Sequence, residues 1–242
     1  MKIQVFTLFP EMFDGPVNAS IIKRAREKGI IDLELINIRD FADNHYSQTD
    51  DYPYGGGAGM VLKADIVIPA LAFLKTSDSY VVYMSPQGKP FNQKKAAALA
   101  AKPHLMILCG HYEGIDERIL TQVDEEISIG DYILTGGEIP ALVIIDAVSR
   151  LLPGVLGREE SLHEESFSHD MLGYPQYTRP SVFQDLEVPP LLLSGNHEHI
   201  RLWRKKQSLL KTLLKRPELL LKKKYSAEEK GLLIELLFSE EK

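Results

Sequence analysis

Residues 126–140, EISIGDYILTGGEIP, decide the fold class, because they lead from a predicted strand into a predicted helix. The loop between them contains three glycines, Gly130, Gly136 and Gly137. Glycine lets the backbone adopt positive φ and approach a ligand closely. A strand–loop–helix of this kind presents backbone N–H and C=O groups, which suits a flat, polar, nucleoside-like ligand. The alternative is an ordinary glycine-rich turn between a strand and a helix, which is common.

Two further predicted strands precede loops of the same character. Residues 80–84 (YVVYM) run into SPQG, and residues 105–109 (LMILC) run into GHYEG. Predicted helices follow at 92–101 and 138–152. Strands that alternate with helices indicate an α/β fold with a mostly parallel sheet. Ligands of such sheets lie beyond the carboxyl ends of the strands, so the three loops are expected to line one pocket.

The N-terminal part of the chain continues the same alternation. Strands are predicted at 2–8 and 31–38, and helices at 20–28 and 63–74. Residues 40–59 form a long polar loop without periodicity, and a loop of that length is usually functional or disordered. Its GGGAG is not followed by Gly-Lys-Ser/Thr, and no GxGxxG follows a strand. A P-loop ATPase and a classical dinucleotide-binding fold are therefore both unsupported.

The C-terminal part of the chain has a different organisation. Residues 157–193 lack periodicity and are rich in proline and glycine. Asn196 is predicted to cap a helix that runs to Arg216, and Ser226 and Glu229 form a capping box before residues 232–238. We therefore expect an α/β domain over 1–158, an interdomain linker over 159–175, and a small all-helical domain over 176–242.

Composition limits the class of protein. The 242 residues are 44% hydrophobic, enough for a sizeable core. The single cysteine, Cys109, excludes an internal disulfide and is expected to be a buried thiol. No secretory signal and no membrane-spanning run is present, so we expect a soluble, cytoplasmic protein without a membrane partner.

Charge is unevenly distributed along the chain. The net charge is −6, yet residues 201–224 contain ten Lys or Arg and one acid, Glu218. A basic segment on an acidic chain is typical of a localised polyanion site. A solvated helix face is the alternative interpretation.

Several motifs together closely resemble the bacterial tRNA (guanine-N1-)-methyltransferases, the TrmD family. They are YMSPQG (83–88), CGHYEGIDER (109–118), SIGDYILTGGEIPALVIIDAVSRLLPGVLG (128–157), YTRP (177–180) and LLSGNHEHIRLWR (192–204). FPEMF and PYGGGAGM near the N-terminus also match, so the resemblance covers nearly the whole chain.

The resemblance implies a SPOUT-type α/β domain with a trefoil knot, a helical C-terminal tRNA-binding domain, and a homodimer. It also implies transfer of a methyl group from S-adenosyl-L-methionine to N1 of the guanosine directly 3′ of the tRNA anticodon, position 37. By matched position, the cofactor pocket would consist of Tyr83, Met84, Ser85, Pro86, Gln87, Gly88, Gly110, Tyr112, Glu113, Gly114, Ser128, Ile129, Gly130, Asp131, Tyr132, Ile133, Leu134, Gly136, Gly137 and Pro140.

The resemblance also assigns catalytic residues. Arg150 matches the catalytic arginine of the family, and Glu165 stands where the family usually has an aspartate base. A second acidic position of the family is Gly173 here, with Asp170 three residues upstream as a lesser candidate for the base. Tyr52 replaces a usual arginine. From the residues alone, Arg150 can also be an exposed charge that stabilises the C-terminal end of its helix. Glu165 can also be a solvated acid in an acidic loop.

No strong metal motif is present, and Asp50 and Asp51 are candidates to hold Mg²⁺. Two other functions remain open at this point. One is a SPOUT methyltransferase with another RNA target. The other is an RNA-binding protein that keeps the pocket but is catalytically impaired, which the departures at Tyr52, Glu165 and Gly173 suggest.

Overall fold

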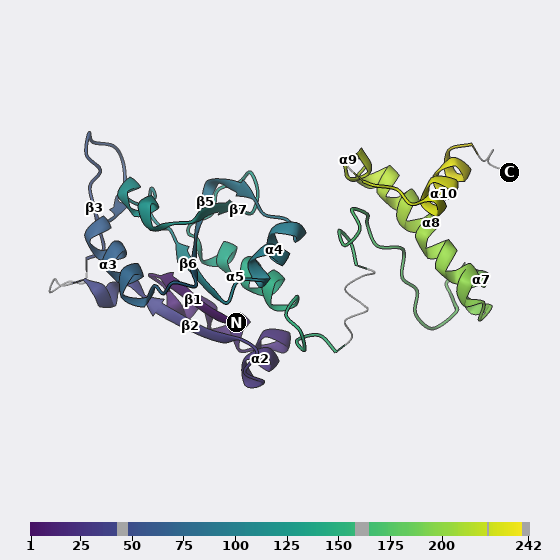
Figure 1. Cartoon of the computed structure of the whole chain (residues 1–242), viewed down its shortest axis with the longest axis horizontal. Helices are drawn as coiled ribbons and strands as arrows, with labels where there is room; N and C mark the ends of the chain where they lie inside the picture. Colours follow the sequence, from purple (N-terminus) through teal and green to yellow (C-terminus); the bar gives the residue numbers. More distant parts are fainter. Residues whose placement is uncertain (43–47, 158–164, 222, 239–242) are drawn as a thin grey trace. The chain divides into compact units, whose positions relative to one another are not determined.

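The computed structural model describes residues 1–42, 48–157, 165–221 and 223–238, and the chain divides into two compact units, Met1–Gly157 and Arg158–Lys242. Parts of the predicted loop 40–59 and of the predicted linker 159–175 therefore lie outside the described residues. Figure 1 shows the elements of both units. In the described part of the chain, no helix is both long enough and apolar enough to span a membrane.

The first unit is built on a five-stranded sheet with the order β2-β1-β6-β5-β7. All of its pairings are parallel, as the alternation of strands and helices predicts. The α/β class is therefore confirmed. Its strands are β1 (Lys2–Thr7), β2 (Asp32–Asn37), β5 (Ser79–Pro90), β6 (His104–Cys109) and β7 (Glu125–Ser128).

Helices cover both faces of this sheet, because its central strands are apolar on both sides. In β6, Leu105 and Ile107 point into one buried cluster, and Met106 and Leu108 point into the other. The first cluster lies under α2 (Ser20–Glu27), α4 (Gln93–Ala100) and α5 (Glu138–Ser149), and the second lies under α3 (Ala64–Leu74). The short elements are η1 (Pro10–Phe13), α1 (Asp14–Val17), η2 (Ile38–Phe41) and η3 (Glu117–Gln122).

Two predicted boundaries in this unit are wrong. Strand β5 does not end before SPQG but continues to Pro90, and both Met84 and Lys89 pair with Ile127 around an irregularity. Gly88 makes this passage possible, since a Cβ there would lie 2.4 Å from the Ile127 N. The predicted loop 40–59 contains β3 (Asp50–Asp51), which pairs antiparallel with β4 (Val61–Leu62).

The second unit is organised by α8 (His197–Lys215), whose residue Leu209 forms a small core with Met171 and Leu220. The predicted caps are confirmed. The Asn196 side chain accepts from the His199 N (3.2 Å), and Ser226 and Glu229 bond reciprocally, so the last helix begins at Ala227 rather than Leu232. The remaining elements are β8 (Val182–Phe183), β9 (Leu186–Glu187), α7 (Pro190–Leu193), α9 (Glu218–Leu221) and α10 (Ala227–Phe238).

The hairpin of β8 and β9 corrects one expectation, because this unit is not all-helical. Each strand has only two residues, which is too short for a periodic pattern to reveal it.

Candidate functional site

A cavity of about 480 Å³ lies where the SPQG stretch inside β5 meets the loops after the neighbouring strands β6 and β7. The expectation that these three segments line one pocket is confirmed, although SPQG belongs to β5 itself and is not a loop beyond its end. The predicted cofactor residues all line it except Gly88 and Asp131. The cavity is also lined by His111, Ile115, Glu117, Leu120, Glu126, Ile127 and Thr135, of which Glu126, Ile127 and Thr135 lie in the stretch 126–140 that the sequence singled out.

Glycines let two of these loops pack backbone against backbone. The Gly137 N donates to the Gly110 O (2.8 Å), and a Cβ at Gly137 would lie 2.7 Å from the Cys109 Cα. A Cβ at Gly110 would lie 2.7 Å from the Tyr83 hydroxyl. Larger residues at either position would separate the loops, so the glycines are needed to form the cavity wall.

The loop after β7 is closed by its own hydrogen bonds. The Ser128 hydroxyl donates to the Gly130 O (3.1 Å) and accepts from the Gly130 N (3.2 Å), while Gly130 has a φ of +148°. Tyr132, Ile133 and Leu134 then follow as exposed side chains on the cavity rim. Large apolar side chains left exposed together are typical of a surface that a ligand or partner covers.

The cavity is acidic and contains a neutral hydroxyl. Glu113, Glu117 and Glu126 line it. Burial, and then the charges of Glu126 and Glu117, raises the pKa of Tyr83 to about 12. The Tyr83 phenol therefore keeps its proton at neutral pH and can donate a hydrogen bond. The site suits a polar ligand that carries positive charge.

A buried layer beneath the cavity connects it to the end of β1. The Thr7 hydroxyl donates to the Glu138 carboxylate (2.7 Å) and accepts from the Phe9 N (3.0 Å). The Phe9 ring lies 4.8 Å from the His111 ring, measured between centroids. Sequence reasoning missed the roles of Thr7 and Glu138, although the matched motifs FPEMF and GGEIP mark both segments.

Cys109 lies in the same layer and is fully buried, as predicted. Burial, and then the neighbouring charge of Glu138, raises its pKa, so it remains a thiol.

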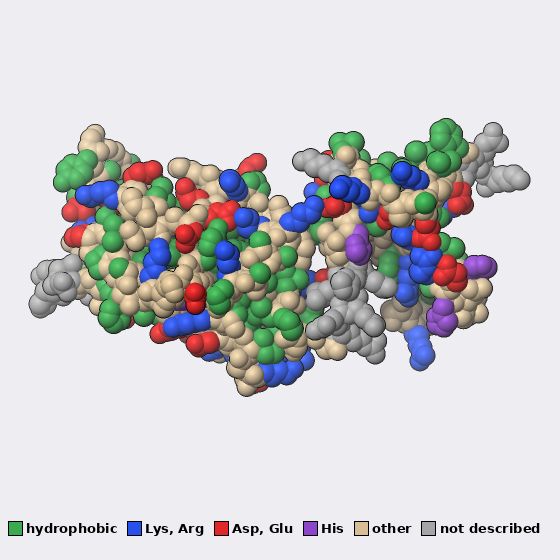
Figure 2. Space-filling view, in the orientation of Figure 1, with side chains coloured by type: hydrophobic (Ala, Val, Ile, Leu, Met, Phe, Trp, Pro, Cys, Tyr) green, Lys and Arg blue, Asp and Glu red, His purple; other side chains and the backbone are tan. Residues whose placement is uncertain are grey.

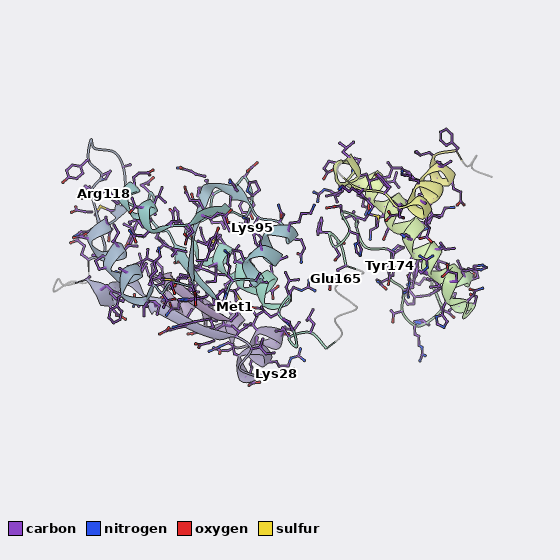
Figure 3. The ribbon with its side chains drawn as sticks, in the orientation of Figure 1. Met1, Lys28, Lys95, Arg118, Glu165 and Tyr174 are labelled. Atoms are coloured by element: carbon purple, nitrogen blue, oxygen red, sulfur yellow. The ribbon has the colours of Figure 1, made fainter. Side chains whose placement is uncertain are left out.

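The predicted catalytic residues are divided between the two units. Arg150 is the C-cap residue of α5 in the first unit. Glu165 and Asp170 belong to the second unit, where Figure 3 marks Glu165 and Tyr174 on the segment that precedes β8. Asp170 has a φ of 54° and lies in a tight turn with Glu165.

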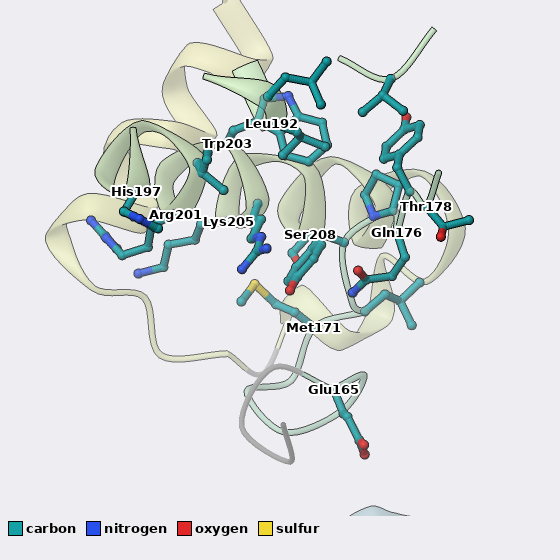
Figure 4. A pocket seen from close by; sticks show the side chains of 18 of the residues that line it. Glu165, Met171, Gln176, Thr178, Leu192, His197, Arg201, Trp203, Lys205 and Ser208 are labelled. Carbon is teal, nitrogen blue, oxygen red and sulfur yellow. The ribbon is translucent and has the colours of Figure 1, made fainter. Parts of the chain in front are cut away.

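The second unit has a cavity of its own, of about 1010 Å³, between α8 and the segment around Tyr174 and Tyr177. The Tyr177 and Trp203 rings lie 6.4 Å apart, and the Arg204 guanidinium lies 4.8 Å from the centre of the Tyr174 ring. Figure 4 shows the Glu165 carboxylate pointing away from the other labelled side chains of this cavity. Aromatic and cationic side chains together suit contact with nucleobases.

Many cations of the basic stretch are paired within the second unit. Arg201 bonds to both Glu198 and Glu228, and Lys223 pairs with Glu229 (3.2 Å). Figure 2 shows the resulting mixture of basic and acidic side chains on this unit. The other pairs are Lys205–Glu228, Lys206–Glu235 and Arg216–Glu218. The excess positive charge is therefore smaller than the sequence of this stretch alone indicates.

The first unit is therefore a parallel α/β domain with an acidic cavity, and the second unit is rich in lysine, arginine and exposed aromatic rings. Comparison with known proteins shows the family to which such a chain belongs. The family model described as tRNA (Guanine-1)-methyltransferase TrmD matches residues 1–222. The chain belongs to this family, and the resemblance inferred from its motifs is confirmed.

Individual relatives match almost end to end. A tRNA (guanine-N(1)-)-methyltransferase of Syntrophomonas wolfei is 64% identical over 241 residues, covering 100% of this chain and 99% of the relative. The protein of the same name from Carboxydothermus hydrogenoformans is 61% identical, covering 96% and 92%. That of Dictyoglomus turgidum is 53% identical, covering 98% and 96%.

Proposed function

We propose that this protein transfers a methyl group from S-adenosyl-L-methionine to N1 of the guanosine at position 37 of tRNA, directly 3′ of the anticodon. The observation that carries the proposal is the convergence of the SPQG stretch of β5 and the loops after β6 and β7 on one cavity, in a chain that belongs to the TrmD family. The relatives bear the name of a tRNA (guanine-N(1)-)-methyltransferase.

The cavity fits such a cofactor in size and chemistry. Its volume of about 480 Å³ lies within the range typical of small-molecule sites. Gly110, Gly136 and Gly137 leave backbone groups accessible for a flat nucleoside, and three glutamates offset a positive charge. When bound, the cofactor supplies a methyl group on a positively charged sulfur.

The residues of the chain have two tasks in this reaction. The proton on guanine N1 must be removed, and we assign that role to the Glu165 carboxylate. Negative charge then develops at guanine O6, which the Arg150 guanidinium is proposed to stabilise. Alignment of N1 with the methyl group provides a further part of the rate enhancement.

The turn that carries Glu165 also shows how this chain departs from the family pattern. Gly173 lacks a carboxylate, and its N–H donates to the Ser166 hydroxyl (2.9 Å), so this position supports the turn through the backbone alone. Asp170 lies in the same turn and is our second candidate for the base.

The remaining parts of the proposal concern architecture and partners. We propose a SPOUT-type trefoil knot in the first unit, tRNA binding by the second unit, and a cytoplasmic homodimer. Met12 on η1 and Ile139 and Val143 on α5 are apolar and exposed, and the two elements contact each other, which supports the dimer.

The described residues contain no cluster of three metal-ligating side chains. We propose that Mg²⁺, where it is used, is held by Asp50 or Asp51 together with oxygen atoms of the RNA and water, because Mg²⁺ prefers few protein carboxylates and retains waters.

The test is methyl transfer to unmodified tRNA by the wild type and by Glu165→Gln, Asp170→Asn and Arg150→Lys. We expect Glu165→Gln to lose transfer at least 100-fold, in the range of general-base catalysis (~10²–10⁴-fold), while cofactor affinity stays unchanged. Near-normal turnover of Glu165→Gln with loss in Asp170→Asn would move the base to Asp170. Binding of tRNA and cofactor without turnover by the wild type would identify a catalytically impaired RNA-binding protein.

A further inference from the structure

The segment that carries Glu165 is a closed turn rather than an extended connection. The Phe167 N donates to the Met171 O (2.7 Å), and the Ser168 N donates to the Glu165 O (3.3 Å). Phe167 and Asp170 both have left-handed backbone conformations, with φ of 75° and 54°. Aspartate adopts this conformation more readily than most residues, but for phenylalanine it is unfavourable and persists where the surrounding structure holds it.

One end of this turn is held by a fully buried hydroxyl on α8. The Leu172 N donates to the Thr212 hydroxyl (2.9 Å), and that hydroxyl donates to the Ser208 O (2.6 Å). Thr212 has an exposed fraction of 0%, so water does not replace either bond. Next to it, Met171 is packed in the core of the second unit with Leu209 and Leu220.

The middle of the turn is held by a buried ammonium group. Lys223 donates to the His169 O (2.9 Å) and pairs with Glu229 (3.2 Å), and the two charged side chains are only 6% and 8% exposed. Glu229 is itself fixed by the capping box with Ser226. The cap of α10 thus fixes Glu229, and Glu229 in turn fixes the position of the Lys223 ammonium group that holds the turn.

We propose that Thr212 and Lys223 are positioning residues for the Glu165 carboxylate, so that the second unit sets the orientation of the acid. This inference rests on the proposed function, in which Glu165 is the base. The two residues act through backbone groups at His169 and Leu172, which belong to the turn that Glu165 begins. An acid held in this way is pre-organised, and a misplacement of about 1 Å can cost roughly 100-fold in rate.

The principal test is single-turnover methyl transfer at saturating cofactor and tRNA, with substitutions at Thr212. Thr212→Val keeps the shape but removes both hydrogen bonds, and we expect the rate to fall roughly 10- to 100-fold. Thr212→Ser restores the hydroxyl and is expected to restore the rate to within about threefold. Cofactor affinity should change less than about twofold in both variants, because the cofactor cavity lies in the first unit.

Controls separate positioning from a general loss of stability. Tyr225→Phe also removes a hydrogen bond to the backbone of the second unit, from the Tyr225 hydroxyl to the Leu220 O (2.9 Å), but that bond involves no residue of the turn, and phenylalanine keeps the ring that packs on the core. It should leave the rate unchanged. For the lysine, Lys223→Met combined with Glu229→Gln avoids leaving a buried unpaired carboxylate, and it should slow transfer as Thr212→Val does.

A double-mutant cycle decides the question. If Thr212 acts through Glu165, then Thr212→Val in the Glu165→Gln background causes no further loss. An equal loss in both backgrounds, or an equal loss in Tyr225→Phe, would overturn the inference. Failure of the proposed function is distinguishable, because Glu165→Gln alone would then match the wild type.

Discussion

Gly137→Ala is the substitution whose effect on the cofactor site follows most directly from the geometry. Gly137 has a φ of −83° and a ψ of −4°, which alanine adopts freely, so no backbone strain is involved. The added Cβ would lie 2.7 Å from the Cys109 Cα and 2.9 Å from the Gly110 N. These are backbone atoms, and ordinary contact begins near 3.4 Å, so the two loops must separate by several tenths of an ångström.

That separation has a calculable cost. Overpacking typically costs about 1–3 kcal/mol. Weakening of the bond from the Gly137 N to the Gly110 O, now 2.8 Å, adds roughly 0.5–1.5 kcal/mol. The total is about 1.5–4.5 kcal/mol. If the conformation that binds the cofactor bears this cost, the affinity falls roughly 10- to 2,000-fold.

Isothermal titration with S-adenosyl-L-methionine measures this loss directly. The matched control is Gly15→Ala, because a Cβ at Gly15 meets nothing within 4 Å and its φ is not positive. The control should bind as the wild type does. Wild-type affinity in a folded Gly137→Ala protein would refute the assignment of this loop contact to the cofactor site.

Three further predictions follow from the charges. Burial, and then the charge of Lys2, lowers the pKa of His104 below 6.5 in the folded protein. As the pH drops below about 6.5, the unfolded chain therefore binds a proton at His104 before the folded protein does, and the melting temperature should fall. This fall should be smaller in His104→Gln. Hydrogen bonds from Arg201, then Lys205, lower the pKa of Glu228 from 4.5 to about 2. The stability that these bonds give is therefore present above pH 4.5 and is lost toward pH 2. Fluorescence emission of the single tryptophan, Trp203, should report this loss. Affinity for tRNA should decrease with salt, and Lys211→Ala should reduce the slope of log affinity against log salt concentration by about one. Lys206→Ala should reduce this slope less, because Lys206 is already paired with Glu235. Equal slopes for the two variants would contradict this reasoning.

The sequence predicts those features that depend on neighbouring residues or on general rules of parallel sheets. The caps at Asn196 and Ser226 follow from local side-chain chemistry. The common cavity follows because parallel strands present their carboxyl ends at the same edge, where β5, β6 and β7 are neighbours.

Features that depend on distant partners are not predictable in this way. The course of β5 beyond Met84 depends on its register with β7. The bond between Leu172 and Thr212 joins residues 40 apart, and the pair of Arg201 and Glu228 joins residues 27 apart. No local pattern marks either contact, so the turn around Glu165 reads as a linker in the sequence although Met171 is part of the second core.

The most direct test of the central claim is nucleoside mass spectrometry of an unmodified tRNA after incubation with the protein and S-adenosyl-L-methionine. The transcript should carry guanosine at position 37 and at the position before it, with a matched transcript in which adenosine replaces the guanosine at 37. We predict 1-methylguanosine at position 37 of the first transcript and none in the second. Absence of methylation despite binding of both substrates, or methylation at another nucleotide, would contradict the account.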